Sequence, residues 1–171
     1  MRISNFLFLA PLLLVSCMRM PEVTRRGELP AGSELGVILF QDCLIPDQED
    51  CTGSGNLAAN VFAKVFSQSA KFRAVPLSRP VGPKAPLSDD AAVALAKEKG
   101  FKYVINGEVI DFYDVAPMTF RVDRAGVSIR ILRVADGSVI AFFTHKKNAK
   151  SNFATPSDVV QEMAEHVRDS L

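Results

Sequence analysis

The chain has 171 residues, of which 48% are hydrophobic and 23% are charged. These proportions are typical of a globular protein, and they exclude both a disordered chain and a protein with several membrane spans. Lys and Arg number 20 against 19 for Asp and Glu. Nucleic-acid binding needs a net basic face, so no nucleic-acid partner is expected.

The first 16 residues have the pattern of a secretory signal peptide. A positive charge at Arg2 precedes an apolar run from Phe6 to Val15, and the small residue Ser16 follows. The apolar run has about ten residues, whereas a membrane-spanning helix needs about 20. The segment is therefore predicted to be a cleaved signal and not a permanent anchor.

Leu14-Val15-Ser16-Cys17 resembles the lipobox of bacterial lipoproteins. The resemblance implies cleavage before Cys17 and attachment of lipid, including palmitate, to this residue. Two or three acyl chains hold a protein firmly on a membrane where one chain does not. Because Met18 follows the cysteine, the resemblance favours the outer membrane, with the domain in the periplasm. The alternative is an ordinary secreted protein in which Cys17 carries no lipid.

Residues 17–33 contain proline and glycine and show no apolar periodicity. This composition predicts a flexible tether after the lipidated cysteine. The remaining residues, 34–171, are long enough for one domain with a single core.

The domain is predicted to alternate strands and helices and then to end in a meander and a helix. Ser88 and Thr155 are predicted helix caps, Gly107 marks a bulge or a close backbone approach, and Asp136-Gly137 joins two strands. Strands are expected at residues 36–40, 72–77, 101–112, 119–134 and 139–146, and helices at 56–69, 88–100 and 155–171. The order βαβαβββα predicts a single α/β domain whose mixed sheet is covered by helices.

Three segments of this domain resemble a group of envelope proteins: residues 36–40 (GVILF), 100–109 (GFKYVINGEV) and 128–140 (SIRILRVADGSVI). They look like segments shared by the curli-secretion lipoprotein, the amino-terminal domain of TolB and the lipoprotein activators of penicillin-binding proteins. The resemblance implies a non-enzymatic domain that binds or regulates another envelope protein in cell-wall synthesis, secretion or appendage assembly.

Lipidation of Cys17 would leave two cysteines, Cys43 and Cys51, in a polar loop. Disulfides persist in the oxidising compartment that the signal peptide indicates, so these two residues are predicted to pair. The alternative is two free thiols. A bridge would fix residues 44–50 as a compact projection beside the first strand, where a partner could bind.

A turn formed by Gly53, Ser54, Gly55 and Asn56 precedes a predicted helix. Free amides at a helix start can bind an anion, so one hypothesis is a small-ligand or anion-binding module. The alternative is a flexible turn in which Ser54, Gly55 or Asn56 caps the helix.

Aromatic and sulfur-containing side chains gather around the end of the long strand: Phe112, Tyr113, Met118 and Phe120. An apolar loop of this kind is either a partner-binding patch or the edge of the core. The sequence leaves both interpretations open.

The titratable residues do not form a recognisable catalytic or metal-binding pattern. His145 and His166 are predicted at the domain surface or core boundary, and a zinc site needs three or four converging ligands. Asp111 and Asp114 fall at a strand end, where acidic residues commonly mark a turn. No cofactor, metal or enzymatic activity is expected.

Overall fold

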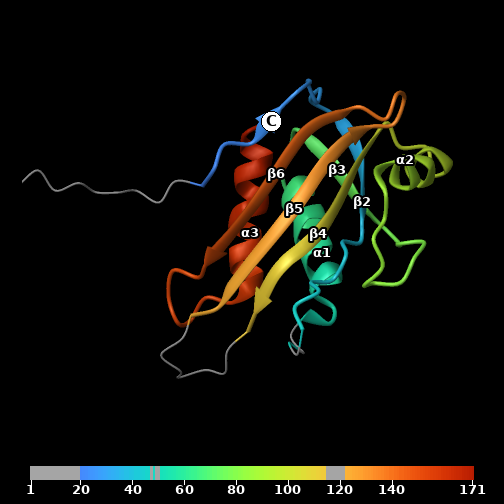
Figure 1. Ribbon diagram of the computed structural model, residues 1–171. Helices are drawn as coiled ribbons and strands as arrows, with labels where there is room; N and C mark the ends of the chain where they lie inside the picture. The colour runs from blue at the N-terminus through green and yellow to red at the C-terminus, as the bar shows by residue number, and fades with distance from the viewer. Residues whose placement is uncertain (1–19, 47, 49–50, 115–121) are drawn as a thin grey trace, which may run out of the picture.

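The computed structural model describes residues 20–46, 48, 51–114 and 122–171, which form one mixed sheet flanked by helices (Figure 1). The strand order across the sheet is β1-β6-β5-β4-β2-β3. The elements are β1 (Thr24–Arg25), β2 (Ser33–Ile38), α1 (Ser54–Ser67), β3 (Phe72–Leu77), α2 (Asp89–Glu98), β4 (Tyr103–Tyr113), β5 (Arg124–Arg133), β6 (Val139–Asn148) and α3 (Pro156–Asp169). The predicted α/β class is confirmed, and β1 is an additional strand in front of the predicted order.

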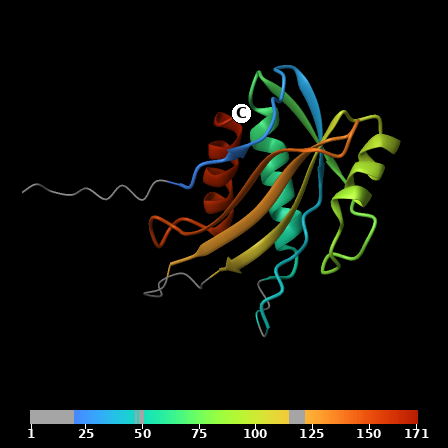
Figure 2. The same ribbon diagram turned by 45° about the horizontal axis from the view of Figure 1, so that its top comes forward.

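Helices cover both faces of the sheet (Figures 1 and 2). β2 is central and runs parallel to both β3 and β4. Successive side chains of a strand point to opposite faces, and Val37 accordingly lies in the core beneath α1 and α3, while Ile38 lies in the core beneath α2. The continuous apolar run that predicted this strand therefore reflects burial on both sides.

The meander β4-β5-β6 is antiparallel and contains an irregularity that redirects two side chains. Val109 pairs with Val127, but Asp111 pairs with Gly126, so Ile110 is an extra residue in β4. An extra residue moves every following side chain to the opposite face. The bulge thereby turns Asp111 away from the core beneath α3 and turns Phe112 into it.

Gly107 is a site of close approach, but the approaching groups are side chains and not the backbone that the sequence predicted. A β-carbon at this position would lie 2.9 Å from Ile129 and 3.1 Å from the Phe40 ring. The bulge that the sequence also allowed here lies further along β4, between Val109 and Asp111.

The amino-terminal boundary of the domain differs from the predicted one. Thr24 and Arg25 pair with Phe142 and Ala141 of β6, and Val23 and Leu29 are buried. Most of the predicted tether therefore belongs to the domain. The segment escaped prediction because two buried apolar residues six positions apart show no strand or helix period.

Both predicted helix caps are present. The hydroxyl of Ser88 accepts a hydrogen bond from the Ala91 amide at the start of α2. Thr155 and Asp158 form a reciprocal capping box at the start of α3. None of the helices in the described parts of the chain is long and apolar enough to cross a membrane.

The capping box makes the stability of the domain depend on pH. Hydrogen bonds from the Thr155 backbone N–H and hydroxyl hold the pKa of Asp158 below its ordinary value. A carboxyl with a lowered folded-state pKa stabilises fully above its unfolded pKa, about 3.9, and this stabilisation disappears as the pH falls through the folded-state pKa.

We therefore expect Asp158→Asn to lower the free energy of unfolding by about 0.5–1 kcal/mol at neutral pH. The difference from the wild type should shrink at about pH 2.5, because protonation of the folded-state carboxylate increases as the pH falls below the unfolded pKa. Urea unfolding at the two pH values measures this. An equal difference at both values would contradict the assignment.

Candidate partner-binding surface

The loop between β2 and α1 is closed by a disulfide. Cys43 and Cys51 are bonded, their Cα atoms lie 5.0 Å apart, and both side chains are buried. The predicted bridge is thus present in the structure. Between the two cysteines the side chain of Leu44 remains 60% exposed, so the closed loop presents an apolar group to solvent.

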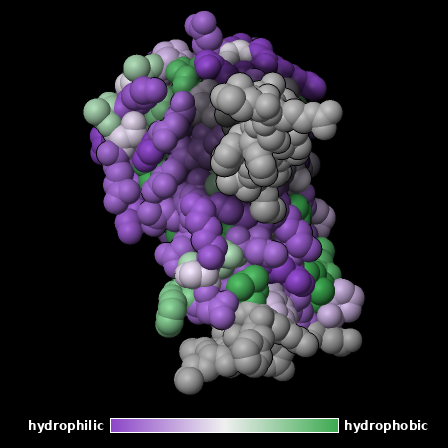
Figure 3. Space-filling view, turned by 90° about the vertical axis from the view of Figure 1, so that its left-hand side faces the viewer, coloured by the Kyte–Doolittle hydropathy of each residue, from purple (hydrophilic) through white to green (hydrophobic). Residues whose placement is uncertain are grey.

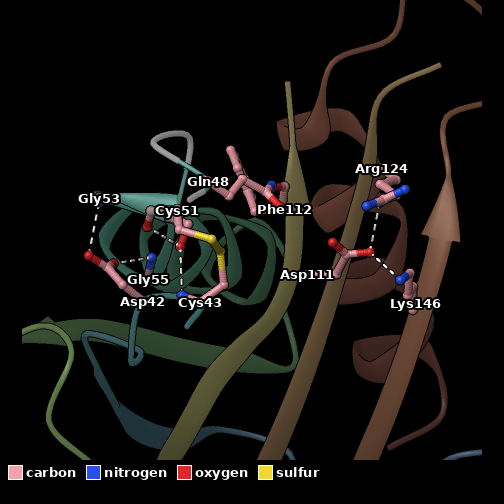
Figure 4. Close-up of a disulfide and its surroundings, with 11 residues drawn as sticks. Asp42, Cys43, Gln48, Cys51, Gly53, Gly55, Asp111, Phe112, Arg124 and Lys146 are labelled. Atoms are coloured by element: carbon pink, nitrogen blue, oxygen red, sulfur yellow. Dashed lines mark hydrogen bonds and ion pairs between the residues drawn. A yellow bond between two sulfur atoms is a disulfide. The ribbon is translucent and has the colours of Figure 1, made fainter. Parts of the chain in front are cut away.

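A carboxylate of the chain itself binds the start of α1. Asp42 is buried, and its two oxygens accept hydrogen bonds from the Gly53 amide at 2.9 Å and the Gly55 amide at 2.7 Å (Figure 4). The first amides of a helix have no partner within the helix and favour negative charge. The Asp42 carboxylate therefore supplies the negative charge that the anion-site hypothesis expected from a separate ligand.

The other two residues of the predicted anion loop also have structural partners. The buried Ser54 hydroxyl donates to the Cys51 carbonyl at 2.8 Å and accepts from the Cys43 amide at 3.2 Å. Asn56 is exposed, and its side-chain oxygen accepts from the Asn60 amide group. The turn at 53–56 is thus a helix start tied to the disulfide loop, which corrects the anion-site hypothesis.

α1 begins unusually close to the end of β2. A β-carbon on Gly55 would lie 2.1 Å from the Phe40 carbonyl oxygen, and the Gly55 carbonyl accepts a hydrogen bond from the Phe40 amide. Only glycine fits between these two backbones. The strand end, the disulfide loop and the helix start are therefore one packed unit.

Neighbouring segments hold this unit on two sides. The side-chain amide of Gln48 donates to the Phe112 carbonyl at the end of β4 (Figure 4). On the other side the Asp42 amide donates to the Pro83 carbonyl at 2.8 Å. The Arg79 guanidinium donates to the carbonyls of Leu39, at 3.1 Å, and Ala85.

The resulting surface has three adjoining clefts around the disulfide loop. Their volumes are about 620, 440 and 230 Å³. Three exposed apolar side chains lie at their rims: Leu44, Val81 at 38% exposure and Ile110 at 40%. We call this region the disulfide-loop surface. Apolar groups on a rigid, hollowed surface are typical of sites that bind other proteins.

The sequence left two interpretations open for the aromatic residues at the end of β4, and Phe112 has the one at the edge of the core. Phe112 is only 6% exposed and belongs to the core, because the bulge in β4 directs it inward. Tyr113 is half-buried, and the Arg124 guanidinium lies 4.9 Å from its ring centre. Met118 and Phe120 lie outside the described residues.

An ion-pair cluster that the sequence did not indicate lies beside this strand end. The buried Asp111 carboxylate is 2.9 Å from Arg124 Nε and 2.5 Å from Lys146 Nζ (Figure 4). In the sheet register Gly126 stands between Asp111 and Lys146, and its missing side chain lets the pair meet across β5. The cluster neutralises a carboxylate that would otherwise be buried alone.

The histidines lie at the core boundary, where the sequence placed them. The rings of His145 and His166 lie 6.1 and 5.7 Å from the ring of Phe143. Burial, together with the nearby Lys147 and His166, lowers the pKa of His145. In the described parts of the chain no group of three His, Cys, Asp or Glu side chains is arranged to hold a metal ion.

Comparison with known proteins identifies the fold. No protein-family model and no curated protein sequence matches the chain. Among solved structures, PelC from Paraburkholderia phytofirmans, a dodecamer, is 18% identical, with a TM-score of 0.62 and coverage of 87% of this chain and 94% of PelC.

Two further structures extend this comparison. Lipoprotein GNA1162 from Neisseria meningitidis is 13% identical, with a TM-score of 0.51 over 80% of this chain and 96% of its own. Protein XCC0632 from Xanthomonas campestris is 11% identical, with a TM-score of 0.51 over 88% and 89%. The chain thus has an α/β fold in common with these three proteins, one of which is a lipoprotein.

The Asp42 contact can be tested by substitution. Asp42→Ala would leave two amides at the start of α1 without their acceptor, and we expect a loss of about 2–4 kcal/mol in the free energy of unfolding. Asp42→Asn keeps one acceptor oxygen and should lose less. Urea unfolding of the oxidised protein measures both.

Asp90→Ala is the matched control, because Asp90 is an exposed acidic residue in the first turn of α2. It should change the stability by less than about 1 kcal/mol. Similar small losses for Asp42→Ala and Asp90→Ala would show that Asp42 is not needed at the start of α1.

Proposed function

We propose that this chain is the precursor of an outer-membrane lipoprotein whose periplasmic domain binds another envelope protein without catalysing a reaction. The disulfide-loop surface is the observation that carries the proposal. It is held rigid by the Cys43–Cys51 bridge and by Asp42, yet it leaves Leu44 exposed. Exposed apolar groups on a fixed scaffold favour protein binding with little loss of conformational entropy.

The charged groups of the cleft of about 440 Å³, which we call the middle cleft, favour binding over catalysis. Asp42 and Arg79 are the charged side chains of the middle cleft, and each already makes two hydrogen bonds to the backbone. Groups used in this way are poorly suited to proton transfer, which needs a free acid or base within reach of a substrate.

The amino-terminal segment supports an anchor close to the domain. Met20 packs against the core, and only three residue steps separate it from Cys17, a reach of about 11 Å when extended. The chain enters the domain beside β1 and α3 (Figure 1), and the described surface on that side is largely hydrophilic (Figure 3). A lipid on Cys17 would hold the domain against the membrane without embedding it.

Lipid attachment has a direct test. Cys17→Ala removes the thiol that would accept the lipid, so we expect the variant to remain an uncleaved precursor without label when cells are grown with radioactive palmitate. The wild type should be labelled and shorter. Equal labelling of the two chains would contradict the anchor.

Partner binding is tested by photocrosslinking in cells from a benzoylphenylalanine placed at position 44. We expect a crosslinked product at native expression levels, identified by mass spectrometry. A benzoylphenylalanine at Phe142 is the control, because this side chain is also exposed but lies on β6 beside β1.

Either a different envelope protein or a second copy of the chain would identify the partner. The second outcome would be self-association, the arrangement in which PelC is found. The absence of any product specific to position 44 would remove the support for this surface.

A further inference from the structure

The middle cleft of the disulfide-loop surface lies beyond the carboxyl ends of β2 and β3. β2 is flanked by β3 on one side and β4 on the other, and the connections that follow β2 and β3 pass on opposite faces through α1 and α2. The strand order therefore reverses at β2. In open α/β sheets, ligands bind outside the carboxyl end of the strand at such a point.

The cleft at this position is mainly apolar. Its volume is about 440 Å³, in the lower half of the range for ligand sites. The apolar part of its lining comes from Leu39, Phe40, Val81 and Pro83. A cleft of this size accommodates one or two apolar side chains and not a long extended segment.

One positively charged side chain, that of Arg79, lies in this mainly apolar lining. Arg79 is half-buried, and its carbonyl contacts to Leu39 and Ala85 hold the guanidinium in one orientation. A guanidinium has five N–H donors, so donors remain for a further acceptor. The two oxygens of Asp42 accept from backbone amides, and the described hydrogen bonds of Arg79 go to carbonyls and not to a carboxylate.

Burial also affects the pKa of the Arg79 guanidinium. Desolvation lowers the pKa of Arg79, and the nearby Asp42 partly opposes this effect. Guanidinium groups remain charged in proteins, so the cleft contains a positive charge, while the Asp42 carboxylate in the same lining is held by the Gly53 and Gly55 amides. A ligand that brings an anionic group next to an apolar group would complement both features.

We propose that this cleft binds the carboxyl-terminal end of a partner polypeptide. The last side chain, which is apolar, packs against Leu39, Val81 and Pro83, and the terminal carboxylate accepts hydrogen bonds from Arg79. A terminal residue brings both groups to the cleft on one α-carbon, and carboxylates are bound strongly by a guanidinium held in place. The inference rests on the proposed function, because it names the part of the partner that the surface recognises.

The test uses the mature lipoprotein in detergent micelles and labelled tetrapeptides. Fluorescein-Gly-Gly-Ala-Phe is titrated as the free acid and as the carboxyl-terminal amide, and binding is followed by fluorescence anisotropy. We expect saturable binding of the acid that is at least tenfold tighter than binding of the amide. Replacing the final Phe by Ser should weaken the acid at least tenfold.

Two substitutions assign the effect to the cleft. Arg79→Gln should abolish the preference for the acid, and Arg79→Lys, which retains the charge, should keep part of it. Val81→Asp should weaken binding of the acid peptide at least tenfold. Ile110→Asp is the matched control, because Ile110 is exposed to almost the same extent, 40% against 38%, but does not line this cleft. It should leave binding unchanged.

Several outcomes would overturn the proposal. Equal binding of acid and amide, or a preference that survives in Arg79→Gln, would exclude recognition of the carboxylate by Arg79. Stronger displacement of the peptide by decanoate than by unlabelled peptide would assign the cleft to a fatty acid. An amidated peptide with an internal Glu that binds as well as the free acid would exclude a chain end. Crosslinking from position 44 does not depend on these titrations, so failure of the proposed function and failure of this inference are distinguishable.

Discussion

The carboxylate of Asp42 ties together the parts of the molecule on which the candidate surface depends. It stands just after β2 and binds the first amides of α1, so the exit of the strand and the start of the helix are fixed relative to each other. The Cys43–Cys51 bridge begins at the next residue, and its loop has little freedom once both ends are held. Gly55 completes the arrangement, because any larger residue would collide with the Phe40 carbonyl.

Elements defined by local signals could be predicted from the sequence. The bounds of β3 agree with the predicted residues 72–77, and Ser88 and Thr155 cap the helices that they were expected to cap. Capping and apolar periodicity act within a few residues and are therefore visible in the chain. β1 has only two residues and depends on a strand near the other end of the sequence, so its formation leaves no local pattern.

The parts of the site that depend on residue chemistry could be predicted from the sequence. The parts that depend on contacts between residues distant in the sequence could not. The disulfide followed from the number of cysteines and the compartment that the signal peptide indicates. Asp42 could not be assigned, since its acceptor role depends on backbone amides 11 and 13 residues later. The sequence leaves Phe112 open between core and surface, because strand parity cannot be known before the bulge at Ile110 is seen. One extra residue decides between core and surface.

The pairing of β1 with β6 has a consequence for the order of assembly. Thr24 pairs with Phe142, and the Arg25 guanidinium donates to the carbonyl of Ser170, 145 residues further along. The segment that is synthesised early therefore cannot take its final position until β6 and the last turn of α3 exist. Contacts between such distant residues close large loops and carry a larger entropy cost than local contacts. The stretch next to the amino terminus is thus among the first parts of the domain to be made and among the last to be fixed.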